Sequence, residues 1–222
     1  MTAGYHRAVG FEGFDRDAPA FYAELRVHNT REWWARNRER YERRVLGPMR
    51  DLADELEPEF GEIKIFRPHR DVRFTADKSP YKLHIGMVTR RRVAHYLQLS
   101  EDGLLIGGGA YDVPPAALGR FRAAVDDDVA AAGLEELLSA LASDGFTLMA
   151  DAALRTAPRG FAPDHPRIEL LRLKRLAVAH HEPPADWMFG PAAYDEVRHA
   201  WSTVSAWCVW LDELVGDLLT GR

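Results

Sequence analysis

The sequence predicts an α+β fold in which a mostly antiparallel sheet, formed by the middle of the chain, is flanked by N-terminal and C-terminal helices. Two observations predict this class. Apolar residues recur with helical spacing in the first third and near the C-terminal end, whereas the middle third alternates with the two-residue period of strands. The 222 residues have the length of one domain, so we expect a single domain over residues 1–222 with an ordered core of about 11–218.

The first third is typical of helices. The run Asn29-Thr-Arg-Glu fits a capping box, which predicts that the Asn29 side chain caps a long helix. Gly47-Pro48 is expected to bend that helix, because proline lacks a backbone donor and clashes with the preceding turn. Behind the cap, apolar residues recur at helical spacing and predict one buried face: Trp34, Tyr41, Val45, Met49, Leu52 and Leu56.

The middle of the chain predicts strands joined by short connections. Asp102-Gly103 is typical of a hairpin turn, because glycine adopts the positive φ that such turns require. Strands joined in this way must be antiparallel, since a parallel pair needs a long crossover. The expected strands are 63–65, 71–74, 83–89, 93–99 and 104–111, with a further one within 170–179.

The C-terminal part returns to helical spacing. Helices are expected at 113–125 and 134–141, and a final long helix after Gly190-Pro191. Cys208 lies on the apolar stripe of this helix, so we expect a buried small hydrophobe and not a nucleophile. The stripe should pack on the core through its middle residues, Val204, Cys208 and Leu211.

Charge is unevenly distributed along the chain. The formal net charge is −5, yet residues 62–95 carry nine Lys or Arg against three Asp or Glu, a local charge of +6 that leaves −11 elsewhere. A general nucleic-acid binder is usually basic overall, so nucleic acid is not an expected partner. The pattern indicates a local anion site, although an ordinary charged surface would give the same count.

Cysteine usage and hydropathy indicate the cellular setting. A single cysteine cannot form an intramolecular disulfide, which favours a reducing compartment. No apolar run reaches the roughly 18 residues of a membrane helix, and the first ten residues lack the apolar segment of a signal peptide. A cytoplasmic protein without a membrane partner is expected, and its oligomeric state is left open.

The segment from Arg70 to Lys82 is the candidate site. Its charged groups and one phenol are the types that recognise phosphate or carboxylate. If 70–74 is a strand, Asp71 and Arg73 share one face, and Ser79-Pro80 then turns the chain back. The expected ligand-binding residues are Arg70, Arg73, Lys78, Tyr81 and Lys82, and the tentative catalytic residues are Asp71, Asp77 and Lys78.

Two hypotheses from different classes follow from this segment. In the first, it binds a small anionic ligand, and an aspartate would act as base while a cation stabilises developing negative charge. Whether any reaction occurs is open. In the second, the chain is a protein-interaction or scaffold domain, and the segment is a buried ion-pair network that pins a loop to the sheet.

Two other signals are weaker. Gly107-Gly108-Gly109 could hold an anion with backbone N–H groups, so Gly108 and Gly109 are included as candidate ligand-binding residues. The run lacks the remaining residues of a P-loop, and glycines in a strand more often mark a bulge or the close approach of a bulky neighbour, which favours packing. None of the nine histidines stands in a metal-ligand spacing, so we expect no metal, and the sequence identifies no cofactor.

The motifs together resemble an uncharacterised bacterial and fungal family, domain of unknown function 2461. The resemblance rests on Arg70-Asp-Val-Arg-Phe with Asp77-Lys-Ser-Pro-Tyr-Lys, on Asn29-Thr-Arg-Glu-Trp-Trp, on Gly107-Gly-Gly-Ala-Tyr followed by Pro114, and on Leu171-Arg-Leu-Lys. It covers roughly residues 11–210. It implies an α+β fold and a bacterial cytoplasmic setting, and it implies no established activity.

Overall fold

A computed structural model describes residues 10–71, 73 and 77–219 of the chain. Residue contacts group the chain into two compact units. Unit 1 comprises Met1–Met87, Gln98–Leu104 and Glu182–Arg198, and unit 2 comprises Val88–Leu97, Leu105–His181 and His199–Arg222. The boundaries fall inside several strands and inside the last helix. A single domain over residues 1–222 stays a prediction.

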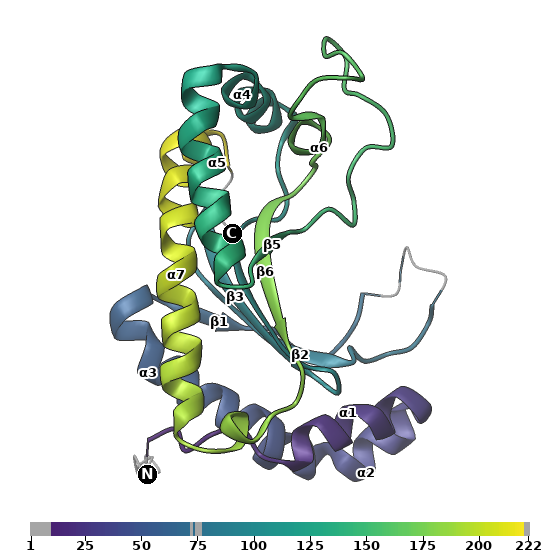
Figure 1. The fold of residues 1–222 in the computed structure, drawn as a ribbon. Coiled ribbons are helices and arrows are strands. Elements are labelled where there is room, and N and C mark those ends of the chain that lie inside the picture. Colours follow the sequence, from purple (N-terminus) through teal and green to yellow (C-terminus); the bar gives the residue numbers. More distant parts are fainter. Residues whose placement is uncertain (1–9, 72, 74–76, 220–222) are drawn as a thin grey trace. The chain divides into compact units, whose positions relative to one another are not determined.

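The elements confirm the α+β prediction (Figure 1). The strands form one mostly antiparallel sheet in the order β1-β2-β3-β4-β6-β5, and β5 pairs antiparallel with β6. The strands are β1 (Ile63–Ile65), β2 (His84–Thr89), β3 (Ala94–Ser100), β4 (Gly103–Ala110), β5 (Thr147–Leu148) and β6 (Leu176–Glu182). In the described part of the chain the α-helices are α1 (Asp17–Val27), α2 (Arg31–Tyr41), α3 (Gly47–Phe60), α4 (Pro115–Asp126), α5 (Asp128–Ser143), α6 (Ile168–Leu171) and α7 (Ala192–Val215). Shorter pieces are the π-helical η1 (Glu42–Leu46) and the 3₁₀ turns η2 (Asp186–Phe189) and η3 (Gly216–Leu218).

The predicted cap of α2 is wrong by one residue. Thr30 is the N-cap, and its Oγ1 accepts a hydrogen bond from the backbone N–H of Trp33 at 3.1 Å. Asn29 does not cap the helix, because its side-chain amide is bonded to the backbone of Tyr81. Position N3 is therefore Trp33, and no capping box forms with Glu32.

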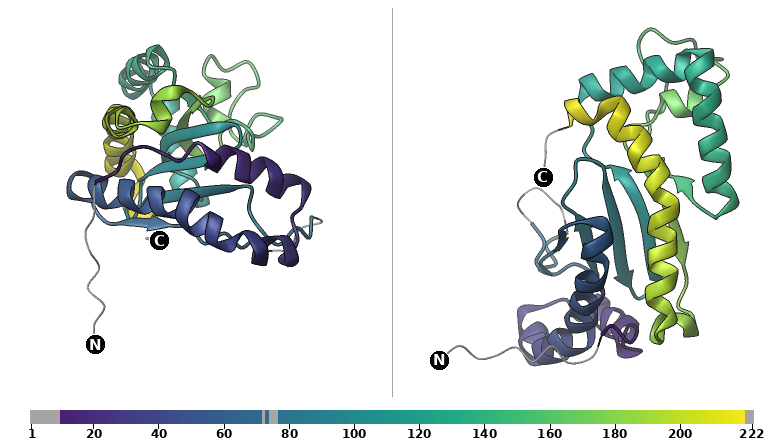
Figure 2. Two further views of the ribbon diagram at one scale, coloured as in Figure 1. Left: turned by 90° about the horizontal axis from the view of Figure 1, so that it is seen from below. Right: turned by 90° about the vertical axis from the view of Figure 1, so that its left-hand side faces the viewer.

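The predicted apolar face of the N-terminal helices is confirmed. Its six members, Trp34 to Leu56, are all at most 7% exposed. The bend expected at Gly47-Pro48 stays a prediction. One π-helical stretch, η1, precedes this pair and separates α2 from α3, since a wider turn accommodates a proline that cannot donate. Figures 1 and 2 show α1 and α2 side by side, and Phe21 of α1 contacts the Trp33 ring of α2.

The expected strand at 71–74 is wrong at Asp71 and Arg73. Asp71 has no regular structure and Arg73 lies in a turn, while Val72 and Phe74 lie outside the described residues. The Asp71 carboxylate accepts a hydrogen bond from the backbone N–H of Arg73 at 3.2 Å. Such local bonds from an aspartate to its own backbone compete with a strand ladder, which explains the turn.

The remaining strand and helix predictions hold, with shifted bounds. Gly103 has φ +104°, as the Asp-Gly hairpin requires. The last strand begins at Leu176, because the short helix α6 occupies the start of the expected range. In unit 2, the predicted core residues of α7 lie in a hydrophobic cluster with side chains of α4 and α5, among them Phe121 and Leu134.

Candidate anion-binding site

The described residues of the segment 70–80 lie in unit 1 outside helices and strands; we call this segment the loop, and backbone pairing closes its base. His69 and Tyr81 form an antiparallel bridge. On either side of it, the Arg70 N–H donates to the Pro80 carbonyl at 2.9 Å, and the Lys82 N–H donates to the Pro68 carbonyl at 2.8 Å. The two ends of the loop are therefore fixed to each other.

Tyr81 anchors this base to α2. Asn29 donates from Nδ2 to the Tyr81 carbonyl at 2.9 Å, and its Oδ1 accepts from the Tyr81 N–H at 3.1 Å. The Tyr81 ring stacks on Trp34 with centroids 4.1 Å apart and planes inclined by 10°. Tyr81 is only 5% exposed. The predicted ligand-binding tyrosine is thus placed as a structural anchor.

The charged groups of the loop pair with each other near its tip. Arg73 binds Asp71 through both Nε and Nη2, at 2.9 Å and 2.6 Å, and Arg70 forms an ion pair with Asp77. Asp77 also accepts a hydrogen bond from the Ser79 N–H at 2.9 Å. The Arg73 and Asp71 side chains are 75% and 50% exposed, so this pair is a surface pair. Lys78 is exposed.

Both aspartates are held in the ionised form. The side chain of Arg73 donates to Asp71 and lowers the pKa of that carboxyl to about 2. Hydrogen bonds from Ser79, followed by that from Arg70, lower the pKa of Asp77 to about 2. A carboxylate with so low a pKa is a weak base near neutral pH. The geometry therefore favours orientation of the arginines over proton transfer.

Three further cations gather beside the base of the loop. The ammonium groups of Lys64 and Lys82 lie 5.6 Å and 5.2 Å from the centre of one ring, Phe66. Burial, followed by the charges of Arg67 and Lys64, lowers the pKa of Lys82. Among the described residues, no carboxylate lies within ion-pair distance of Lys64 or Lys82. We call Lys64, Arg67 and Lys82 around Phe66 the basic cluster.

The pairing of β1 with β2 brings this cluster together. The Phe66 N–H donates to the Gly86 carbonyl at 2.9 Å, which places the end of β1 beside the chain that leaves the loop. The charges around the cluster also affect the pKa of His84, at the start of β2. Its pKa is lowered to about 4, chiefly by burial and then by the charges of Lys82 and Arg70. His84 is therefore neutral at pH 7.

The structure sorts the predicted residues into different roles. It pairs Arg70 with Asp77 and Asp71 with Arg73, and it assigns Lys82 to the basic cluster. Sequence reasoning counted Lys64 and Arg67 among the basic residues but did not include them in the site, and it missed Phe66 and His84. The alternation of Ile63, Lys64 and Ile65 was the available signal, because it sets the lysine on the face opposite its two neighbours.

Gly108 and Gly109 belong to unit 2 and are explained by packing. A Cβ on Gly108 would lie 2.6 Å from Val204 Cγ1 and 2.9 Å from Cys208 Sγ. On Gly109, which has φ +132°, it would lie 2.2 Å from the Leu176 carbonyl oxygen. These close approaches favour the packing interpretation of the glycine run over an anion cradle.

Comparison with known proteins gives one match. A family model described as "Conserved hypothetical protein (DUF2461)" matches residues 17–210 of the 222. No curated protein and no solved structure matches the chain. In the part of the chain that the structure describes, no helix is long and apolar enough to cross a membrane.

Proposed function

Because the chain belongs to the DUF2461 family, whose description names no activity, we propose a function from the site alone: unit 1 binds a small phosphate- or carboxylate-bearing ligand at the basic cluster. Lys64, Arg67 and Lys82 would contact the anion. Arg70 and Arg73, each held by an aspartate, would border it.

The observation that carries the proposal is the convergence of like charges at Phe66, where no carboxylate among the described residues lies within ion-pair distance of Lys64 or Lys82. Two ammonium groups share one aromatic ring, and a guanidinium lies close enough to lower the pKa of one of them. Like charges held together are destabilising, more so when partly buried. A bound anion relieves this repulsion, and the surplus of positive charge favours a phosphate over a single carboxylate.

Binding without catalysis is the simpler form of the proposal. The tentative catalytic residues Asp71 and Asp77 are engaged by arginine and have pKa values of about 2. Lys78 lies next to Asp77 on the exposed tip. None of these three residues is part of the basic cluster.

The alternative of a buried ion-pair network has less support. That hypothesis requires the loop charges to be removed from water, so that loss of one partner strands a buried charge. The Asp71–Arg73 pair is at least half exposed, and surface pairs contribute little to stability. The anchoring of this loop rests on Tyr81 and Asn29.

We also propose a bacterial cytoplasmic setting, and we propose that nucleic acid is not the partner. The lone Cys208 is buried and unpaired with another cysteine, which suits a reducing compartment. The bacterial origin follows from the family resemblance, and the argument on nucleic acid follows from the acidic balance outside residues 62–95.

Calorimetric titration with pyrophosphate, inorganic phosphate and citrate at low ionic strength tests the proposal. We expect saturable binding of pyrophosphate that weakens as salt is added. Lys82→Ala should weaken it about tenfold, the effect of losing one charge-assisted contact of about 1.4 kcal/mol. Arg36→Ala, which removes an exposed cation of α2, is the matched control and should leave the affinity unchanged.

The absence of saturable heat with all three anions would contradict the proposal. An equal loss of affinity in Lys82→Ala and Arg36→Ala would also contradict it, because general attraction by positive charge would then explain the binding. A loss confined to Arg73→Ala would move the site from the basic cluster to the tip of the loop.

A further inference from the structure

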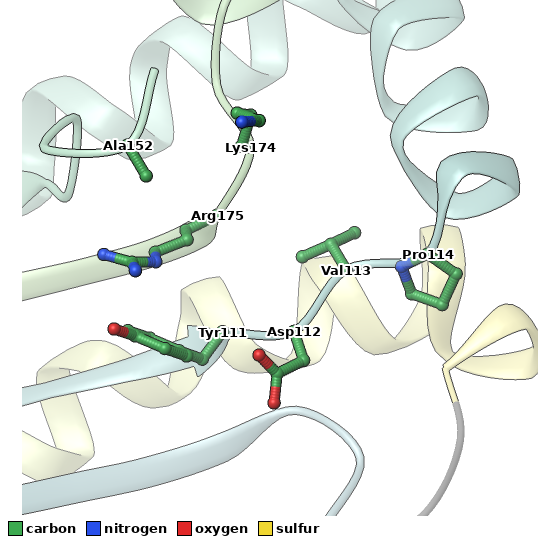
Figure 3. Close-up of a pocket in the computed structure, with 7 residues that line it drawn as sticks. All are labelled: Tyr111, Asp112, Val113, Pro114, Ala152, Lys174 and Arg175. Carbon is green, nitrogen blue, oxygen red and sulfur yellow. The ribbon is translucent and has the colours of Figure 1, made fainter. Parts of the chain in front are cut away.

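Unit 2 contains a groove that the proposed function does not use. It is an open cavity of about 430 Å³ between two segments that are far apart in the sequence (Figure 3). Residues 111–114, which follow β4, form one side. Lys174 and Arg175, which precede β6, form the other, and Ala152 completes the lining. All of these residues belong to the same unit.

Arg175 is fixed within this groove. Its guanidinium carbon lies 4.0 Å from the centre of the Tyr111 ring, and its Nη1 forms an ion pair with Asp151. Figure 3 shows the guanidinium above the tyrosine ring. A guanidinium held on an aromatic face and by a carboxylate keeps its remaining N–H donors in one plane, so little freedom is lost when it binds an anion.

A second source of positive potential lies at the same groove. Helix α4 begins at Pro115, directly after the lining residues Val113 and Pro114. Its N-cap residue, Pro114, makes no side-chain capping hydrogen bond. The free N–H groups at the start of a helix, together with its dipole, attract negative charge. Lys174 is exposed on the opposite side of the groove.

The charges of the groove match a single negative charge. Arg175 is balanced by Asp151, which leaves the ammonium of Lys174 as the surplus. Asp112 also lines the groove, but its carboxylate points away from the two cations (Figure 3). The rest of the lining, Val113, Pro114 and Ala152, is apolar. A ligand that fits has one anionic group and a small apolar body.

We propose that this groove binds a small organic monocarboxylate. The carboxylate pairs with Lys174, in the positive potential of Arg175 and of the start of α4, and the apolar body lies on Val113 and Pro114. The site is independent of the basic cluster in unit 1, so either can fail without the other. It also differs from that cluster in ligand, because its smaller positive surplus disfavours phosphate dianions.

Chemical-shift perturbation in ¹⁵N-labelled protein tests this assignment, with benzoate, acetate and inorganic phosphate as probes. Benzoate should shift the amides of residues 111–113, 116, 117, 152 and 174–175 in a saturable manner, and it should bind more tightly than acetate because of its apolar ring. Lys174→Ala should weaken benzoate binding at least fivefold. Arg159→Ala removes an exposed cation of the same unit outside the groove and should leave the affinity unchanged.

Three results would overturn the proposal. The first is the absence of saturable shifts at these residues with benzoate. The second is tighter binding of phosphate than of benzoate in the groove, since this would contradict a monocarboxylate site. The third is an equal effect of Lys174→Ala and Arg159→Ala. Shifts confined to the surroundings of Lys64 and Lys82 would support the site in unit 1 and refute this one.

Discussion

The base of the loop and the basic cluster are neighbours in unit 1, yet their physical character is opposite. At the base, Tyr81 is buried, stacked on Trp34 and bonded through both backbone polar groups to Asn29. In the cluster, Lys64 and Lys82 converge on Phe66 without a carboxylate partner among the described residues. The polar groups of the Tyr81 backbone are hydrogen-bonded and its ring is packed, whereas like charges converge in the cluster, where we propose that an anion binds.

This difference separates stability from binding within one short motif. The six residues Asp77-Lys-Ser-Pro-Tyr-Lys include both the anchoring Tyr81 and Lys82, which we propose binds the anion. Tyr81 should control whether unit 1 folds, and Lys82, the next residue, should control whether it binds an anion. Residues that are adjacent in the chain should therefore give opposite results when substituted.

The largest expected effect is at the anchor. Tyr81→Ala should lower the free energy of unfolding by about 3 kcal/mol or more, because it removes a buried ring that stacks on Trp34. Urea denaturation followed by tryptophan fluorescence measures this change. A loss below about 1 kcal/mol would show that the contacts of Tyr81 do not anchor the loop.

A somewhat smaller loss is expected for Asn29→Ala. This change leaves the N–H and the carbonyl of Tyr81 without their side-chain partner, at a cost of about 1–3 kcal/mol of unfolding free energy, measured by urea denaturation.

Thr30→Ala removes the cap of α2 and should cost about 1 kcal/mol of unfolding free energy. A larger loss of stability for Thr30→Ala than for Asn29→Ala would contradict the assignment of Asn29 as a main anchor of Tyr81.

The titration of His84 links the cluster to pH. Its pKa is about 4 in the folded protein and 6.5 without the protein environment. The unfolded state therefore binds more protons between these values, and this residue destabilises the protein as the pH falls through that window. Pyrophosphate should raise the pKa of His84 toward 6.5, because a nearby anion favours the protonated ring. NMR titration of the histidine resonances, with and without pyrophosphate, measures both values. An unchanged pKa would place the anion elsewhere.

The smallest effect on stability is expected at the tip. Arg73→Ala breaks an exposed pair with Asp71, so the thermal midpoint should not change measurably. In the parent protein, the contribution of this pair is present above the ordinary Asp71 pKa of 3.8 and is lost as the pH falls toward 2, whereas the variant lacks it at every pH. Strong destabilisation by Arg73→Ala near neutral pH would instead support the ion-pair network.

The sequence predicted most of the fold because the fold depends on periodicity. The buried face from Trp34 to Leu56 and the Asp-Gly hairpin follow from local spacing and backbone preference. The strand expected at 71–74 failed for a local reason as well, since an aspartate side chain competed for the backbone of Arg73.

The basic cluster could be predicted only in part, because its geometry is tertiary. The sequence shows a basic stretch, but the convergence of Lys64 and Lys82 depends on the pairing of Phe66 with Gly86. The anchoring role of Tyr81 could not be predicted from the sequence either. A tyrosine between proline and lysine can face a ligand or a core, and only the contacts with Trp34 and Asn29 decide between them.

The most direct test of the division between anchor and cluster is the stability of Lys82→Gln with and without pyrophosphate, measured by urea denaturation. Without the anion, the variant should be as stable as the parent or slightly more stable, because one of three like charges is removed. At a pyrophosphate concentration of 100 times the parent Kd, the parent should gain about 2.7 kcal/mol. The variant, with affinity about tenfold lower, should gain about 1.4 kcal/mol at the same concentration. A variant that is clearly less stable without the anion, yet gains as much as the parent from it, would contradict the account.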